Sequence, residues 1–192
     1  MSEINSSERR LDSGEGREEP PPRRRVHIRW MIRRDMPEVL AIEKASFAQP
    51  WGEEDFLKCL RQRNIGMVVE VGDQVVGFML YELHSKQLRI FNFAVHPDFR
   101  RLKVGTQMVE KLTTKLSTHR RTSISLEVRE TNLAAQLFYK SCGFRATMVE
   151  RDFYEDTGEA AFVMEYWLAD HWPEEVWEWH PRNRISQYLG KL

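Results

Sequence analysis

Residues 93–106, FAVHPDFRRLKVGT, join an apolar run to a cationic loop and then to a helix. The apolar run starts at Leu88 and is typical of a strand, which residues 96–98 (His-Pro-Asp) end. An amphipathic helix is predicted over residues 104–117. Backbone N–H groups at a helix N-terminus, with cations nearby, suit a pyrophosphate. The segment therefore predicts a strand–loop–helix unit that binds a phosphorylated ligand.

A second unit of this kind lies further along the chain, in residues 126–144, LEVRETNLAAQLFYKSCGF. Alternating apolar residues predict a strand at 124–128, and residues 133–142 are predicted to be helical. Gly143 follows as the glycine that commonly ends a helix. The small side chains of Ala134 and Ala135 would let this helix lie close to a ligand.

Outside these two units, the remaining sequence adds strands on both sides and two helices. The predicted strands cover residues 26–32, 67–71, 74–83, 88–95, 124–128, 145–154 and 160–168. The predicted helices cover residues 35–47, 53–62, 104–117 and 133–142, with Asp35 as the N-cap of the first. This order predicts an α/β (α+β) fold, with a mixed, mostly antiparallel seven-stranded sheet and helices on both faces.

Composition restricts the class of protein. The 192 residues are 41% hydrophobic and 30% charged with no formal net charge, so nothing favours DNA or an anionic membrane as a partner. No apolar stretch approaches the length that spans a bilayer, and the first 25 residues lack the apolar core of a secretory signal. The two cysteines, Cys59 and Cys142, have no metal-binding spacing, and we expect both to be buried. A cytoplasmic location is expected.

The chain divides into three parts by composition. Residues 1–25 are rich in Ser, Glu, Arg and Pro and are expected to be disordered, either solvated or docked on an anionic partner such as ribosomal RNA. Residues 26–168 form the folded domain. Residues 169–192 are an aromatic extension, which we expect to pack onto the domain.

The cationic unit resembles motif A of the GNAT superfamily of acetyltransferases, R/Q-x-x-G-x-G/A, with Arg100 at its first position and Gly105 at its last. Lys103 stands where the family usually has its first glycine. Either Lys103 keeps a right-handed backbone and offers a further cation to the phosphates, or its Cβ impairs cofactor binding. We expect the first, because the surrounding elements are intact.

The second unit resembles motif B of the same superfamily, N-x-x-A-x-x-x-Y-x-x-x-G-F, with Asn132 and Tyr139 at its polar positions. Three more patches narrow the resemblance to the ribosomal-protein alanine N-acetyltransferases. They are Glu-Val-Arg at 127–129, Phe-Ala-Gln-Pro-Trp at 47–51, and Arg-Asp-Phe-Tyr at 151–154 followed by Gly-Glu-Ala at 158–160. The resemblance covers residues 28 to 168.

The resemblance implies two catalytic residues. Glu127 matches the general base, and a modest base is enough because an α-amino group has a pKa of about 7.7–8.0. Tyr139 matches the general acid that protonates the departing thiolate of coenzyme A. The alternatives are that Glu127 is an exposed carboxylate paired with Arg129, and that Tyr139 is a core aromatic residue.

The resemblance also implies where acetyl-CoA, as co-substrate, and the acceptor bind. In the family a bulge in the fourth strand splays it from the fifth and exposes a backbone donor for the oxyanion. Asn132 would bond the pantetheine arm, cap the next helix, or do both. The implied cofactor contacts are Phe93, Ala94, Val95, Arg100, Arg101, Leu102, Lys103, Val104, Gly105, Thr106 and Asn132. Trp51 and Tyr154 would wall the acceptor groove, although Trp51 could serve packing alone.

Three functions follow from this reading. The first is acetylation of the N-terminal amine of a protein, a ribosomal one beginning with alanine. The second is acetylation of a lysine side chain or a small amine; lysine would need stronger deprotonation because its pKa is about 10.4. The third is a non-catalytic acetyl-CoA sensor or ribosome-binding module. No metal site is expected, because the six histidines are scattered.

Overall fold

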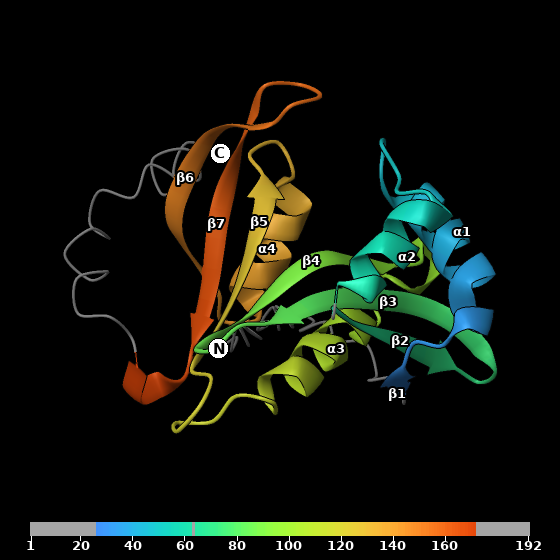
Figure 1. The fold of residues 1–192 in the computed structure, drawn as a ribbon, viewed down its shortest axis with the longest axis horizontal. Helices are drawn as coiled ribbons and strands as arrows, with labels where there is room; N and C mark the ends of the chain where they lie inside the picture. The colour runs from blue at the N-terminus through green and yellow to red at the C-terminus, as the bar shows by residue number, and fades with distance from the viewer. Residues whose placement is uncertain (1–25, 63, 172–192) are drawn as a thin grey trace, which may run out of the picture.

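Seven strands form one sheet in the computed structural model, which describes residues 26–62 and 64–171 (Figure 1). The strands are β1 (His27–Trp30), β2 (Ile65–Val71), β3 (Gln74–Leu83), β4 (Gln87–Val95), β5 (Ser123–Arg129), β6 (Arg145–Tyr154) and β7 (Glu159–Trp167). The helices are α1 (Met36–Ser46), α2 (Glu53–Arg61), α3 (Val104–Thr113) and α4 (Leu133–Ser141), with 3₁₀ turns η1 (Arg33–Asp35), η2 (Pro97–Phe99) and η3 (Ala169–His171). The predicted segment 1–25 and most of the predicted extension lie outside the described residues.

The strand order is β1-β2-β3-β4-β5-β7-β6, and β4 with β5 is the parallel pair among antiparallel ones. A parallel pair needs a crossover, which α3 supplies. The antiparallel pairs β2–β3 and β6–β7 are hairpins whose turns contain Gly72 and Gly158, both with positive φ. The predicted order of elements and the mixed, mostly antiparallel sheet are confirmed.

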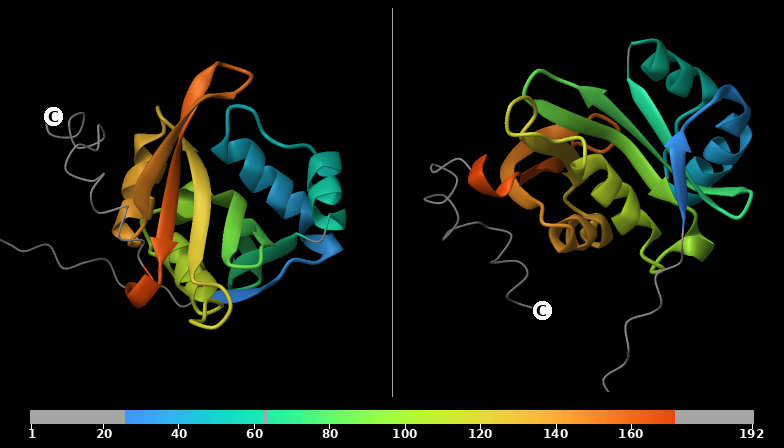
Figure 2. Two further views of the ribbon diagram at one scale, coloured as in Figure 1. Left: turned by 60° about the vertical axis from the view of Figure 1, so that its left-hand side comes forward. Right: turned by 90° about the horizontal axis from the view of Figure 1, so that it is seen from below.

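Each face of the sheet is covered by its own pair of helices (Figure 2). On one face α1 and α2 bury Val39, Ile42 and Phe56 against the sheet. On the other face α3 and α4 pack over a larger core that includes Met108 and Tyr139. The central strands are therefore buried on both sides, which explains their almost continuous apolar sequence.

The sheet opens between β4 and β5. The register of the β3–β4 pair shifts at Leu80 and Tyr81. Leu80 pairs with Asn92 and Tyr81 with Ile90, so Phe91 is left over as the extra residue of a β-bulge. On its other side β4 pairs with β5 only as far as Ile90, and the two strands diverge beyond that point (Figure 1). The bulge implied by the family resemblance is therefore present.

Two predicted details of the first helix are corrected by the structure. The first strand ends at Trp30, and Asp35 occupies the N-cap position of α1 as predicted, but its side chain makes no cap hydrogen bond to this helix. The carboxylate of Asp35 instead accepts hydrogen bonds from the Arg29 guanidinium at 2.7 and 2.8 Å and from the N–H of Ile32. The hydrogen bonds from Arg29 hold the pKa of Asp35 below its usual value. A charged partner 6 residues back in the chain thus outcompetes the helix N-terminus for this carboxylate.

Helix α3 ends at Thr113, earlier than predicted. The hydroxyls of Thr113 and Thr114 donate to carbonyls three residues back, and Lys115 and Leu116 form 3₁₀-type bonds, so the α-helical pattern is lost there. Cys59 is buried as expected, whereas Cys142 at the end of α4 is only partly buried. Among the helices of the described residues, none is long and apolar enough to cross a membrane.

Candidate active site

The N-terminus of α3 presents free backbone donors beside the opening in the sheet. The first α-helical bond of α3 runs from the Gln107 N–H to the Lys103 carbonyl, at 3.1 Å. The amides of Val104, Gly105 and Thr106 precede that bond, so they have no partner inside the helix. Together with the helix dipole they form the anion cradle that the sequence predicted.

The loop before α3 has an unexpected backbone. Lys103 adopts the left-handed conformation, with φ of 62°, and Arg101 does the same with φ of 64°. The expectation that Lys103 is right-handed is therefore wrong. The chain keeps the backbone that a glycine would adopt at this position and accepts a cost of about 1–2 kcal/mol for the Cβ. Both side chains are exposed cations at the helix N-terminus.

Lys103→Gly tests what the lysine adds. We expect acetyl-CoA to bind about two- to fivefold more weakly to this variant, which is the affinity that one exposed ion pair contributes. The loss of affinity should shrink as the salt concentration rises. Calorimetric titration at low and high salt measures both effects. Lys103→Met keeps the Cβ and removes the charge, so it should lose the same affinity. Tighter binding by Lys103→Gly would show instead that the side chain crowds the site.

Arg100 holds the loop in place with its side chain. Its Nε donates to the Val95 carbonyl at 3.0 Å, and its Nη2 donates to Ser46 Oγ at the end of α1 at 3.0 Å. The guanidinium thus ties the cationic loop to β4 and to the helix on the opposite face. Among residues 26–62 and 64–171, no ion pair or hydrogen bond engages the side chain of Arg101 or Lys103, while Leu102 packs against the core.

Gly105 allows aromatic rings to approach the first turn of α3. A Cβ at this position would lie 3.2 Å from the ring of Phe138 and 3.4 Å from that of Phe93. These two rings lie 5.9 Å apart, one on α4 and one on β4. The glycine therefore lets α3, α4 and β4 meet closely beside the anion cradle.

The backbone of β4 beyond the bulge pairs with a strand on one side only, and on its other side the Val95 carbonyl accepts the bond from Arg100. Phe93, Ala94 and Val95 pair with β3, whereas the β4–β5 ladder has already ended at Ile90. Their second edge faces the space between the diverging strands. An extended amide chain such as the pantetheine arm can pair with such an edge, as the resemblance implied.

Glu127 lies on β5 one residue past the last β4–β5 pair. Its carboxylate pairs with Arg89 of β4, at 3.0 Å to Nη2 and 3.4 Å to Nε. The alternative prediction of a pair with Arg129 is wrong, because Arg129 binds other carboxylates. The Glu127 side chain is 14% exposed, so water or an amine can reach it. The ion pair holds the predicted base at the point where the strands separate.

Tyr139 is both a core residue and a neighbour of the opening. It is 7% exposed, and its ring lies 6.4 Å from Phe93 of β4 and 5.3 Å from Phe144. Burial raises the pKa of Tyr139 above its usual value of 10. The phenol is therefore protonated at neutral pH, the state that a proton donor requires.

Asn132 caps α4. Its Oδ1 accepts the N–H of Ala135 at 3.1 Å, which is the N-cap bond that the sequence predicted. The cap leaves the side-chain amide nitrogen, a donor, at an exposed position. Both predicted roles of Asn132 are thus compatible.

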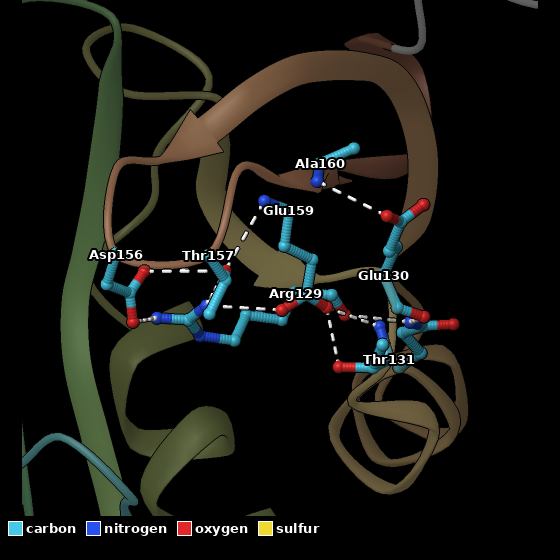
Figure 3. Close-up of polar contacts among 8 residues, drawn as sticks. Arg129, Glu130, Thr131, Asp156, Thr157, Glu159 and Ala160 are labelled. Atoms are coloured by element: carbon cyan, nitrogen blue, oxygen red, sulfur yellow. Dashed lines mark hydrogen bonds and ion pairs between the residues drawn. The ribbon is translucent and has the colours of Figure 1, made fainter.

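Arg129 fastens the β6–β7 hairpin to the end of β5 (Figure 3). Its guanidinium donates to Asp156 at 2.7 Å and to Glu159 at 3.1 Å. It also lies 3.8 Å from the centre of the Tyr154 ring. Glu159 also accepts from the N–H of Thr131 before α4. Two patches of the family resemblance, Glu-Val-Arg and Gly-Glu-Ala, therefore meet in one network that orients Tyr154.

Trp51, in the loop between α1 and α2, packs against an aromatic neighbour. Its ring meets Phe56 edge-on at 5.6 Å, which confirms the packing role. Its backbone N–H donates to the buried carboxylate of Glu43 at 2.9 Å. Glu43 and Arg89 were not found from the sequence, since a lone Glu on a helix and a lone Arg on a strand carry no motif.

The residues predicted from the sequence come from different elements, and several of them lie beside the β4–β5 opening. The α3 cradle, the β4 edge and Tyr139 of α4 line the side predicted for acetyl-CoA. Glu127, Trp51 and Tyr154 come from β5, the α1–α2 loop and the end of β6. A strand pair that opens beside a helix N-terminus, with a carboxylate and a phenol at hand, is the framework of an acyl-CoA-dependent transferase.

Comparisons with known proteins identify the family. The sequence profile of the acetyltransferase (GNAT) family matches residues 27–144, and the chain belongs to this family. It is 30% identical over 132 residues to the ribosomal protein bS18-alanine N-acetyltransferase of Escherichia coli strain K12, covering 68% of this chain and 89% of that protein. It is 32% identical over 120 residues to the enzyme of the same name from Salmonella typhimurium, covering 62% and 81%.

Solved structures agree. The crystal structure of the ribosomal-protein-S18-alanine N-acetyltransferase from Escherichia coli superposes with a TM-score of 0.68 at 27% identity, covering 78% of this chain and 97% of that one. Ard1 from Thermoplasma volcanium superposes with a TM-score of 0.67 at 29% identity, covering 74% and 97%. The protein is an acetyl-CoA-dependent N-acetyltransferase, and the non-catalytic alternative is not supported.

Proposed function

We propose that this enzyme acetylates the α-amino group of a protein N-terminus, and that its acceptor is a ribosomal protein beginning with alanine. The observation that carries the proposal is the similarity to two enzymes named for alanine acetylation on ribosomal protein bS18. The reaction would take place in the cytoplasm, where ribosomal proteins are made.

The site chemistry supports an α-amine. An α-amino group with a pKa of about 7.7–8.0 is partly neutral at pH 7, so a weak base acting through water suffices. Glu127, held by Arg89 at 3.0 Å, is a carboxylate of this kind. The neutral amine attacks the thioester carbonyl, the backbone edge at Phe93 would donate to the oxygen, and Tyr139 would donate a proton to the leaving sulfur.

The acceptor groove would have two walls. Trp51 would form one wall from the α1–α2 loop, and Tyr154, stacked under Arg129, would form the other. The cofactor phosphates would bind at the N-terminus of α3, beside Arg101 and Lys103. This end of α3 fits the phosphates of acetyl-CoA, because the first backbone amides of the helix and the exposed cations Arg101 and Lys103 lie next to one another.

A pair of peptides tests the acceptor class. One carries a free N-terminal alanine and an internal lysine, and the other has the same sequence with a blocked N-terminus. We expect turnover of the first peptide only, measured as thiol release and by mass shift. Peptides with other first residues then test the preference for alanine. Equal acetylation of the blocked peptide would assign the enzyme to lysine or small amines instead.

A further inference from the structure

A buried carboxylate links the elements on the acceptor side of the sheet. Glu43 is on the inner face of α1 and is 1% exposed. Its Oε1 accepts the Trp51 N–H at 2.9 Å, and its Oε2 accepts the Asn92 side-chain amide at 3.1 Å. Asn92 is 7% exposed and follows the bulge residue Phe91 in β4.

The surroundings of Glu43 are unusual for an acidic side chain. Within residues 26–62 and 64–171, no ion pair joins Glu43 to a cation. Burial raises the pKa of Glu43, against the lowering effect of hydrogen bonds from Trp51 and Asn92. A buried carboxylate without a cation is costly, so a residue of this kind needs a reason beyond packing.

Geometry supplies a reason. The two groups that face Glu43, a backbone N–H and an amide NH₂, are both donors, and a carboxylate offers an acceptor oxygen to each. One partner is in the loop that carries Trp51 toward the acceptor. The other is in β4, next to Phe93, where β4 has already parted from β5. The carboxylate thus connects the α1–α2 loop, residues 47–52 and hereafter the acceptor loop, to the edge of β4 that is predicted to hold the thioester.

We propose that Glu43 is a positioning residue, which sets the acceptor loop at a fixed distance from the bulged β4 strand through Trp51 and Asn92. The inference rests on the proposed function insofar as that loop holds the acceptor amine. An error of about 1 Å in the approach of two reactants can lower a rate by about 10²-fold, so such a link controls the reaction without touching either reactant.

A charge swap tests the link. Asn92→Asp places a second carboxylate opposite Glu43 Oε2 and breaks the bond. Glu43→Gln combined with Asn92→Asp restores it with reversed polarity, because the glutamine amide donates to Asp and its oxygen still accepts from Trp51. We expect Asn92→Asp to lower kcat/KM for the acceptor by roughly 10- to 100-fold, and the double variant to recover most of that loss. The KM for acetyl-CoA should change little.

The matched control is Glu38→Gln, which removes one negative charge from the exposed side of the same helix. Its kinetics should equal those of the wild type. Hydrogen exchange at the Trp51 amide gives a readout that needs no turnover: it should accelerate in Asn92→Asp and slow again in the double variant. If Asn92→Asp does not fold, Glu43→Leu keeps the volume and accepts neither bond, and it should show the same kinetic loss.

The outcomes separate this inference from the proposed function. Wild-type kinetics in Asn92→Asp would overturn the positioning role of Glu43. If Asn92→Asp does not fold, wild-type kinetics in Glu43→Leu would do the same. So would a double variant with restored Trp51 protection and unrestored turnover. If the wild type acetylates lysine or a small amine and no peptide N-terminus, the proposed function fails, and the same variants measured on that amine still decide the role of Glu43.

Discussion

Tyr139→Phe is expected to lower turnover by about 10²–10⁴-fold while acetyl-CoA still binds, because the phenol is the proposed proton donor to the leaving thiolate. The substitution removes one hydroxyl and keeps the ring that packs against Phe93 and Phe144. Steady-state kinetics and calorimetric binding of acetyl-CoA measure the two halves of this expectation. Raising the pH should not rescue the variant, since hydroxide does not supply the missing proton.

Tyr166→Phe is the matched control, because Tyr166 belongs to the same aromatic cluster, 5.7 Å from Phe144. It should retain wild-type turnover, and both variants should keep their stability to within about 1 kcal/mol. If Tyr139→Phe also retained wild-type turnover, Tyr139 would be a core residue alone, with the fold and family unaffected.

Glu127→Gln is expected to reduce turnover at neutral pH by a similar factor, about 10²–10⁴-fold, because it removes the group that accepts the amine proton. The deficit should shrink as the pH rises through the amine pKa of about 7.7–8.0, since solvent then deprotonates the acceptor. A pH–rate profile from pH 6 to 10 therefore separates this variant from Tyr139→Phe.

The control for this substitution is Glu165→Gln, because Glu165 lies on the neighbouring strand β7, opposite Ser125 of β5 in the strand register. It should leave the pH–rate profile unchanged. A Glu127→Gln enzyme whose deficit stayed constant across the pH range would point to a structural role for the Glu127–Arg89 pair, such as holding β4 and β5 together where they part.

Much of the fold could be predicted from sequence because it depends on local patterns. Alternating apolar residues predicted strands such as β5, and Gly143, with φ of 91°, ends α4 as predicted. A backbone conformation that is unfavourable for its residue type could not be predicted. Lys103 adopts a left-handed φ, which a non-glycine residue avoids unless its surroundings require it. The end of α3 was predicted too late, because the apolar pattern continues past Thr113 and does not reveal the bonds that the hydroxyls of Thr113 and Thr114 donate to backbone carbonyls.

The candidate site was predictable where motifs exist and not where contacts are long-range. Tyr139 was predicted from its position in motif B, and Glu127 from the Glu-Val-Arg patch at 127–129 that precedes this motif. Arg89 reaches Glu127 across 38 residues of chain, and Glu43 reaches Asn92 across 49, so no local pattern reveals these contacts. The same holds for Arg129, whose true partners lie in the hairpin 27 to 30 residues further on rather than two residues back.

The opening between β4 and β5 has a mechanical consequence. Among the residues that the structure describes, only four pairs, from Gln87 with Ser123 to Ile90 with Leu126, join the strands β1 to β4 to the strands β5, β7 and β6 through the sheet. The sheet therefore consists of two half-sheets hinged along a short seam. A cofactor whose amides pair with the free edge of β4 acts as a substitute strand across that hinge. Occupancy by acetyl-CoA should accordingly stiffen the whole domain, and mutations in the seam should loosen donor and acceptor sites together.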